Sequence, residues 1–123
     1  MKSNYAVLIH PDCAPKKINV PYGVEGLLET FRIVKKENEI FAHGKEIDVS
    51  VLQLNDKAHL LYVEDGNKLN LLPNRTIGRI SLYGTMLIIN LDKYGEMAEM
   101  TEIEAHHFCY VFDRTSIPTA ALL

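Results

Sequence analysis

The stretch Ile47-Asp-Val-Ser-Val-Leu-Gln-Leu-Asn-Asp-Lys-Ala-His-Leu-Leu-Tyr-Val-Glu64 decides the fold. Apolar and polar residues alternate from Ile47 to Val51, which is the period of a strand with one buried face. Asn55-Asp56-Lys57 supplies turn residues, and His59 to Glu64 is a second apolar run of strand length. The stretch therefore predicts two antiparallel strands joined by a turn.

Further strand patterns lie on both sides of this pair. Asp65-Gly66-Asn67 is a strong turn signal, and the alternation of Leu69 and Leu71 extends the pattern to an antiparallel meander over residues 47–72. Three other segments also have strand composition: residues 5–9, 17–20 and 86–91. Residues 73–79 follow no period and therefore predict a loop.

Two segments predict helices. The first begins at Pro21 and ends near Lys36, and its apolar residues form one stripe at helical spacing: Val24, Leu27, Leu28, Phe31 and Val34. The second begins with Thr101-x-x-Glu104, a capping box that satisfies two free amides at a helix start, and covers residues 102–113. Its predicted inward residues are Ile103, His107, Phe108, Val111 and Phe112.

Together these patterns predict a single α+β domain over residues 1–115. We expect a mixed, largely antiparallel sheet of five or six strands with both helices packed on one face. Residues 37–46 leave two alternatives: a short strand at Ile40-Phe41-Ala42, which we prefer, or a second helical turn. Residues 116–123 are small and contain a proline, so we predict a frayed tail.

Composition restricts the class of protein. With 123 residues, 47% of them hydrophobic and 24% charged, the chain fits one globular domain. Its net charge of -3 divides into +2 over residues 1–45 and -5 over residues 46–123. Nonspecific nucleic-acid binding needs a basic stripe, and only the short pairs Lys16-Lys17 and Lys35-Lys36 approach one. We therefore predict that nucleic acid is not a partner.

The pattern of apolar runs and cysteines predicts where the protein is located. No signal-peptide pattern and no apolar run of membrane-spanning length occurs in the sequence, so we predict a cytoplasmic protein that does not bind membranes. The two cysteines, Cys13 and Cys109, lack a close spacing motif and predict free thiols in a reducing compartment.

Catalytic and metal-binding patterns are weak. The sequence contains no G-x-S-x-G elbow and no glycine-rich phosphate loop, so we predict a protein that is not an enzyme and has no cofactor. His106, Cys109 and Asp113 share one face of the second helix, and their side chains are types that bind zinc. A half-exposed helix face explains the same spacing, and we predict no metal.

The predicted fold does not explain the polar residues of the segment Asn74-Arg75-Thr76-Ile77-Gly78-Arg79. Two guanidinium groups near an amide and a hydroxyl are suited to grip a phosphate or carboxylate. The alternative is a turn whose arginines are solvated. Tyr83 is suited to stack on a planar ligand or to form the edge of the core, and Gly84 predicts either a bulge or close backbone approach. The candidate ligand-binding residues are Asn74, Arg75, Thr76, Arg79, Tyr83, Gly84 and Thr85.

Residues 58–108 resemble a family of small proteins of unknown function common in phages and mobile elements, and residues 5–31 show a weaker similarity to it. The likeness consists of an acidic-glycine turn, a P-N-R tripeptide, a G-T-hydrophobic strand and a short C-terminal helix. In this chain the matching positions are Pro73, Asn74, Arg75, Gly84 and Thr85. Residues 32–46 are longer than the family's usual connection. The family has no established catalytic residues, so the resemblance implies none.

The resemblance implies a phage or prophage protein in a host cell, and small phage proteins often counter host defence. We expect a homo-oligomeric, non-enzymatic sponge that sequesters a small anionic signal derived from a nucleotide, because this fits the arginine-rich segment. A protein–protein inhibitor or regulator of a host defence factor is the alternative, which fits the acidic second half of the chain. A hydrolase without a recognisable motif is a third possibility.

Overall fold

The computed structural model describes residues 4–123. Its main sheet has six strands in the order β2-β1-β7-β4-β3, with β8 also paired to β7. Every pairing in this sheet is antiparallel. The strands are β1 (Asn4–Ile9), β2 (Lys16–Val20), β3 (Val49–Gln53), β4 (Ala58–Val63), β7 (Met86–Leu91) and β8 (Met97–Ala98). The predicted α+β class with a largely antiparallel sheet is confirmed.

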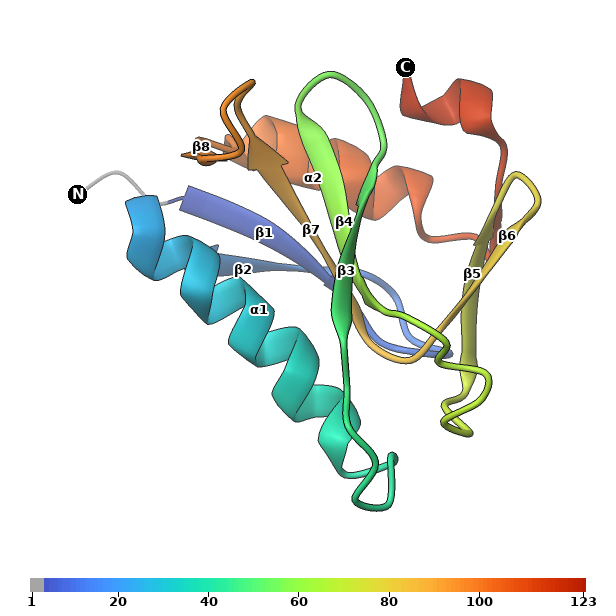
Figure 1. Cartoon of the computed structure of the whole chain (residues 1–123). Helices are drawn as coiled ribbons and strands as arrows, with labels where there is room; N and C mark the ends of the chain where they lie inside the picture. Colours follow the sequence, from blue (N-terminus) through green and yellow to red (C-terminus); the bar gives the residue numbers. More distant parts are fainter. Residues whose placement is uncertain (1–3) are drawn as a thin grey trace.

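The two helices, α1 (Gly23–Glu39) and α2 (Glu102–Val111), pack on opposite faces of this sheet (Figure 1). Alternate residues of β7 show the division, because Ile88 lies in the core beneath α2, with Phe108, while Leu87 lies in the core beneath α1, with Val34. The prediction that both helices cover one face is wrong. Strand β7 is buried at every position, as expected for a strand covered on both sides.

A second sheet corrects two further predictions. It contains β5 (Pro73–Ile77), β6 (Ile80–Tyr83) and β9 (Ser116–Ile117), with β5 in the middle. Residues 73–79 are therefore mainly strand and not loop. The C-terminal residues do not fray, because Ile117 is fully buried and the 3₁₀ helix η1 (Thr119–Leu122) places Leu122 in the core beneath α2.

Two short segments also differ from the predicted strands. Residues 40–44 form hydrogen-bonded turns that continue from α1, in which the Phe41 N–H donates to the Asn38 carbonyl at 3.1 Å. The preferred strand at residues 40–42 is wrong, and the helical-turn alternative is nearer to the structure. Residues 64–70 are turns, so the strand predicted around Leu69 and Leu71 is also absent from the described residues.

The face of α1 that contacts the sheet is more polar than the predicted stripe. Val24 and Leu28 are 73% and 60% exposed, while Leu27 and Phe31 are partly buried. The fully buried positions instead lie four residues apart: Gly26, Thr30, Val34 and Asn38. At residue 26 a Cβ would lie 1.8 Å from the carbonyl oxygen of Pro21, in the segment that leads into the helix, and 3.0 Å from Sδ of Met97 in β8. The helix therefore approaches the sheet through small and hydrogen-bonded residues.

This geometry predicts unequal effects for two apolar residues of α1. Val34 is fully buried, so Val34→Ala should lower the free energy of unfolding by about 2 kcal/mol through lost burial and a new cavity. Leu28→Ala should change it by less than about 0.5 kcal/mol. Urea unfolding of the two variants tests this. Equal effects would show that α1 packs through the stripe predicted from sequence.

The capping box at the start of α2 is confirmed. The Thr101 hydroxyl accepts from the Glu104 N–H at 3.2 Å, and the Glu104 carboxylate accepts from the Thr101 N–H at 3.1 Å. Of the residues predicted to point inward, Ile103 and His107 are exposed, while Phe108, Val111 and Phe112 are buried. Ala105 takes the inner position instead.

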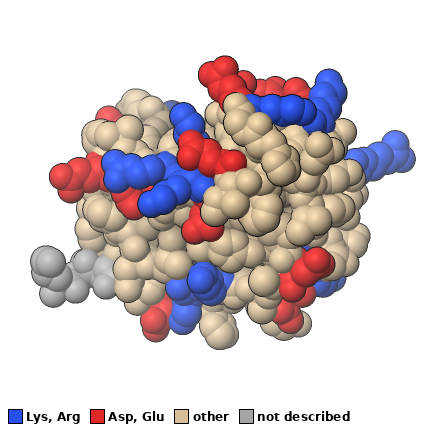
Figure 2. All heavy atoms as spheres, turned by 90° about the horizontal axis from the view of Figure 1, so that it is seen from below, with Lys and Arg blue, Asp and Glu red and all other residues tan. Residues whose placement is uncertain are grey.

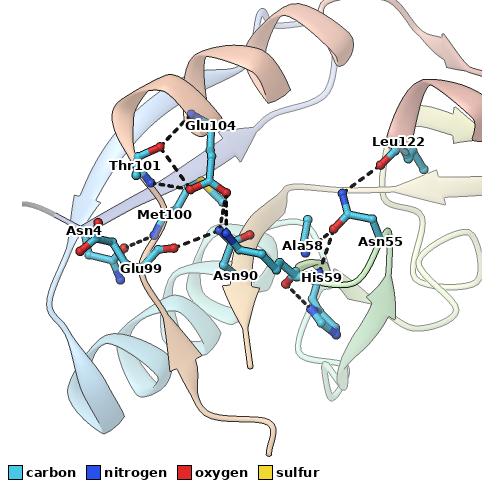
Figure 3. A network of polar contacts seen from close by, with 11 residues as sticks. Asn4, Asn55, Ala58, His59, Asn90, Glu99, Met100, Thr101, Glu104 and Leu122 are labelled. Atoms are coloured by element: carbon cyan, nitrogen blue, oxygen red, sulfur yellow. Dashed lines mark hydrogen bonds and ion pairs between the residues drawn. The ribbon is translucent and has the colours of Figure 1, made fainter. Parts of the chain in front are cut away.

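Glu104 also ties α2 to β7 and to the β3–β4 turn (Figure 3). Its second carboxylate oxygen accepts from the Asn90 amide and pairs with the Lys57 ammonium, both at 3.2 Å. Burial raises the pKa of Glu104, but the Thr101 N–H, Lys57 and Asn90 together hold it below its usual value. These contacts have a structural role and lie outside the candidate site described below.

Candidate functional site

The centre of the candidate site is a β-bulge in β5. The pairing between β5 and β6 shifts register between Pro73 and Thr76. Side chains of a regular strand alternate between its two faces, so two consecutive buried polar residues are unusual. The bulge allows it, and Asn74 and Arg75 are only 8% and 4% exposed.

The guanidinium of Arg75 binds three oxygen atoms of the protein. Nε donates to the Phe112 carbonyl at 2.8 Å, Nη1 to Oδ1 of Asn74 at 2.8 Å, and Nη2 to the Cys13 carbonyl at 2.7 Å. These contacts use three of the five N–H groups that a guanidinium carries. The solvated-turn alternative for Arg75 is therefore wrong.

The charge of Arg75 is not neutralised by direct contact. Within residues 4–123 no carboxylate forms an ion pair with it at 4.0 Å or less. Burial lowers the pKa of Arg75, while Asp113, Asp12 and Cys13 act in the opposite direction from outside ion-pair distance. A buried cation held only by neutral acceptors is energetically costly, and a bound anion would offset that cost.

Asn74 has a structural role at the corner between the two sheets. Its amide nitrogen donates to the carbonyl oxygens of Ile9 at 2.9 Å and Gly84 at 2.7 Å. Asn74 therefore joins β5 to the end of β1 and to the connection between β6 and β7. The same side chain accepts from Arg75, so the corner and the guanidinium support each other.

Asn38 holds the other side of this corner. Its Oδ1 accepts from the Thr85 N–H at 2.9 Å, and its Nδ2 donates to the Thr85 carbonyl at 3.0 Å. The predicted site residues Gly84 and Thr85 are thus bound by the protein itself, and Thr85 is also within 3.0 Å of the His10 ring. Nothing in the sequence marks Asn38, because an asparagine near a helix end is usually solvated.

An open pocket of about 310 Å³ lies beside Arg75. Strands β5 and β6, the β1–β2 loop and the residue before β9 form its walls. It is lined by Asp12, Pro73, Asn74, Arg75, Thr76, Ser81, Leu82, Tyr83 and Thr115. Four of the seven predicted residues therefore lie together around one hollow.

The other three predicted residues lie elsewhere. Arg79 is exposed near the β5–β6 turn and does not line the pocket. Gly84 and Thr85 border a separate, smaller hollow of about 50 Å³. Residues 75 and 79 are separated by the end of β5 and the Gly78 turn, so the pocket that Arg75 lines does not include the second arginine of the predicted pair.

Sequence reasoning missed three polar residues of the pocket. Asp12 comes from the proline-flanked loop, Ser81 from β6 and Thr115 from the segment between α2 and β9. They line the same pocket as Thr76, Tyr83 and Arg75. One cation, one carboxylate and several hydroxyls can bind a ligand that carries both an anionic group and hydrogen-bond donors.

Outside the pocket, the features that bear on function are surface charge, the cysteines, groups of metal-binding side chains and the length of the helices. On the face in Figure 2, blue Lys and Arg residues lie close to red Asp and Glu residues. Cys13 and Cys109 are both free, as predicted. Within residues 4–123, no three His, Cys, Asp or Glu side chains are grouped to hold a metal ion. No helix in that range has the length and apolarity to cross a membrane.

Comparison with known proteins gives no information on the chemistry of this pocket. No protein-family model, curated protein or solved structure matches the chain.

Proposed function

We propose that this chain is a non-enzymatic binding protein that sequesters a small anionic ligand in the pocket beside Arg75. The observation that carries the proposal is the buried guanidinium, 4% exposed, which lines the pocket without an ion-pair partner in the described chain. Two of its five N–H groups donate to no atom of the described chain, and the proposal assigns them to the anion.

The pocket also favours a particular kind of anion. Its volume is near the lower end of the usual range for small-molecule sites, which suits a ligand of about mononucleotide size. The Asp12 carboxylate repels a bare anion but accepts hydrogen bonds from amino or hydroxyl groups, which nucleotides carry. A nucleotide-derived signal is thus our preferred ligand, and the phage anti-defence role implied by the resemblance is our preferred context.

Binding is favoured over catalysis by the composition of the pocket. None of its nine lining residues is a histidine or cysteine, and its one carboxylate has no second carboxylate beside it in the pocket. General acid–base catalysis usually needs such groups in reach of the substrate.

A protein–protein inhibitor is the second candidate, and one feature favours it. Helix α2 exposes Ile103 and Tyr110, 83% and 75% accessible, seven residues apart on its outer side. Residues at this spacing share a helix face, so α2 presents apolar groups away from the core.

An uptake experiment distinguishes these functions. The full chain is incubated with a panel of nucleoside monophosphates and cyclic nucleotides, washed, and heated to release what it holds. Intact release supports sequestration, and an altered product shows an enzyme. Absence of uptake at concentrations well above typical cellular levels would contradict the proposal and favour a protein partner.

Asp12 provides a sharper test of the pocket. Asp12→Asn removes the only negative charge in the lining, so we expect affinity for inorganic phosphate to rise about threefold to tenfold. Asparagine tolerates the left-handed backbone at this position, where φ is 58°, so stability should hardly change. NMR titration with phosphate measures the effect. Asp56→Asn, which removes an exposed carboxylate outside the pocket, is the matched control, and an equal rise in affinity there would place the anion outside the pocket.

A further inference from the structure

The two edges of the main sheet are protected differently. Strand β2 forms one edge and carries Lys16 and Lys17, and prolines 15 and 21 flank it. Lysine and proline on an edge strand prevent another chain from pairing with it. Strand β3 forms the opposite edge with the sequence Val-Ser-Val-Leu-Gln, which has no charge and no proline. It lies at the outside of the sheet in Figure 1.

The register of β3 shows which backbone groups point outward. Ser50 pairs with Tyr62 and Leu52 with Leu60. The Glu64 N–H donates to the Asp48 carbonyl and the Leu54 N–H to the Ala58 carbonyl, so even-numbered residues make the hydrogen bonds to β4. The backbone groups of Val49, Val51 and Gln53 therefore point away from the sheet, and no other strand within residues 4–123 pairs with them.

The side chains of β3 also suit pairing. Val51, at the centre of the strand, is 44% exposed, and Leu52 is only partly buried. Apolar side chains are thus available on both faces of an edge strand. A row of unpaired N–H and C=O groups between such side chains is satisfied best by another extended strand.

We propose that β3 pairs with β3 of a second copy of this chain, antiparallel and centred on Val51. In this register Val51 lies opposite Val51 of the second copy, and Val49 lies opposite Gln53 of the second copy. Every outward N–H therefore faces an outward carbonyl. The pairing forms about six backbone hydrogen bonds. It joins the two main sheets edge to edge.

Charge permits a second copy as the partner at this edge. The chain has a net charge of -3, so two copies repel each other at most surfaces. Strand β3 is uncharged, and its self-pairing places no like charges opposite one another between residues 49 and 53. A two-fold contact of this kind is closed, which explains how an unprotected edge avoids open-ended aggregation. The pocket beside Arg75 is lined by one chain, so the dimer does not depend on the proposed ligand.

The first measurement is the mass of the full chain by light scattering and sedimentation over roughly a hundredfold concentration range. We expect a reversible dimer of twice 13.9 kDa. Amide exchange measured at both ends of the range locates the contact. The Val49, Val51 and Gln53 amides should be protected at high concentration and exchange rapidly at low concentration. A monomer throughout, or rapid exchange of these amides in the dimer, would overturn the proposal.

Val51→Pro tests the contact directly. Proline removes an N–H that points outward, so the ladder with β4 stays intact while the dimer dissociation constant rises at least about tenfold. Val51→Thr keeps both the N–H and the branched shape and is expected to retain the dimer. Should the proline variant fail to fold, Val51→Lys places two positive charges opposite each other instead. A dimer that survives both charged and proline variants would refute β3 pairing and indicate the exposed side of α2.

Discussion

Replacing Arg75 with alanine is expected to lower the free energy of unfolding by about 3–5 kcal/mol. The change leaves the carbonyl oxygens of Phe112 and Cys13 and Oδ1 of Asn74 without their donor. Each orphaned buried acceptor, Phe112 O and Asn74 Oδ1, costs roughly 1–3 kcal/mol, the partly buried Cys13 carbonyl costs less, and the losses overlap. The turn with solvated arginines, which the sequence left as an alternative, would predict almost no change in stability.

Urea unfolding with Arg79→Ala as the matched control measures this effect. Arg79 is exposed and outside the pocket, so its variant should lie within about 0.5 kcal/mol of the original chain. A loss below about 1 kcal/mol for Arg75→Ala would show that the guanidinium is not structural.

The structural role of Arg75 complicates its use as a test of binding. Arg75→Lys keeps the charge but offers a single ammonium where a fork now binds three acceptors, so partial loss of stability is expected. Phosphate affinity should therefore be measured on the folded lysine variant, well below its melting temperature. Retained stability together with lost affinity would separate the ligand contact from the structural one.

Gly84→Ala is the second substitution with a large expected effect, about 3 kcal/mol or more of lost stability. Gly84 has a φ of 80°, which an alanine adopts only with strain. A Cβ there would also lie 2.4 Å from Oδ1 of Asn38 and 2.8 Å from Cδ1 of Leu71. Either the Asn38 and Leu71 side chains or the corner between β6 and β7 would have to move, and the Asn38 contacts with Thr85 would be weakened.

Gly95→Ala separates the cost of the backbone conformation from the cost of the steric contacts. Gly95 has nearly the same φ, 79°, but a Cβ there meets no atom within 4 Å. Its variant should lose only the conformational cost, about 1 kcal/mol. Thermal or denaturant unfolding of both variants gives the difference, which is the packing cost at the corner. Similar losses at the two glycines would mean that Asn38 and Leu71 give way easily.

The local features of the fold were predictable from the sequence. Alternating or continuous apolar residues located β1, β2, β3, β4 and β7, because a strand buries every second residue or, between two layers, all of them. The capping box located the start of α2 because both of its hydrogen bonds lie within four residues.

Tertiary structure alone decided the rest. Strand β5 is polar at Asn74 and Arg75, so its hydrophobic pattern is absent although both side chains are buried. Arg75 donates to carbonyl oxygens 37 and 62 residues away, and Asn38 donates to one 47 residues away. The spacing of apolar residues predicts which side chains are buried. It does not predict which distant backbone oxygens will accept hydrogen bonds from a buried polar side chain. The sequence by itself therefore determined the class of fold and most of its elements, while the helix faces, the second sheet and the role of Arg75 depended on long-range packing.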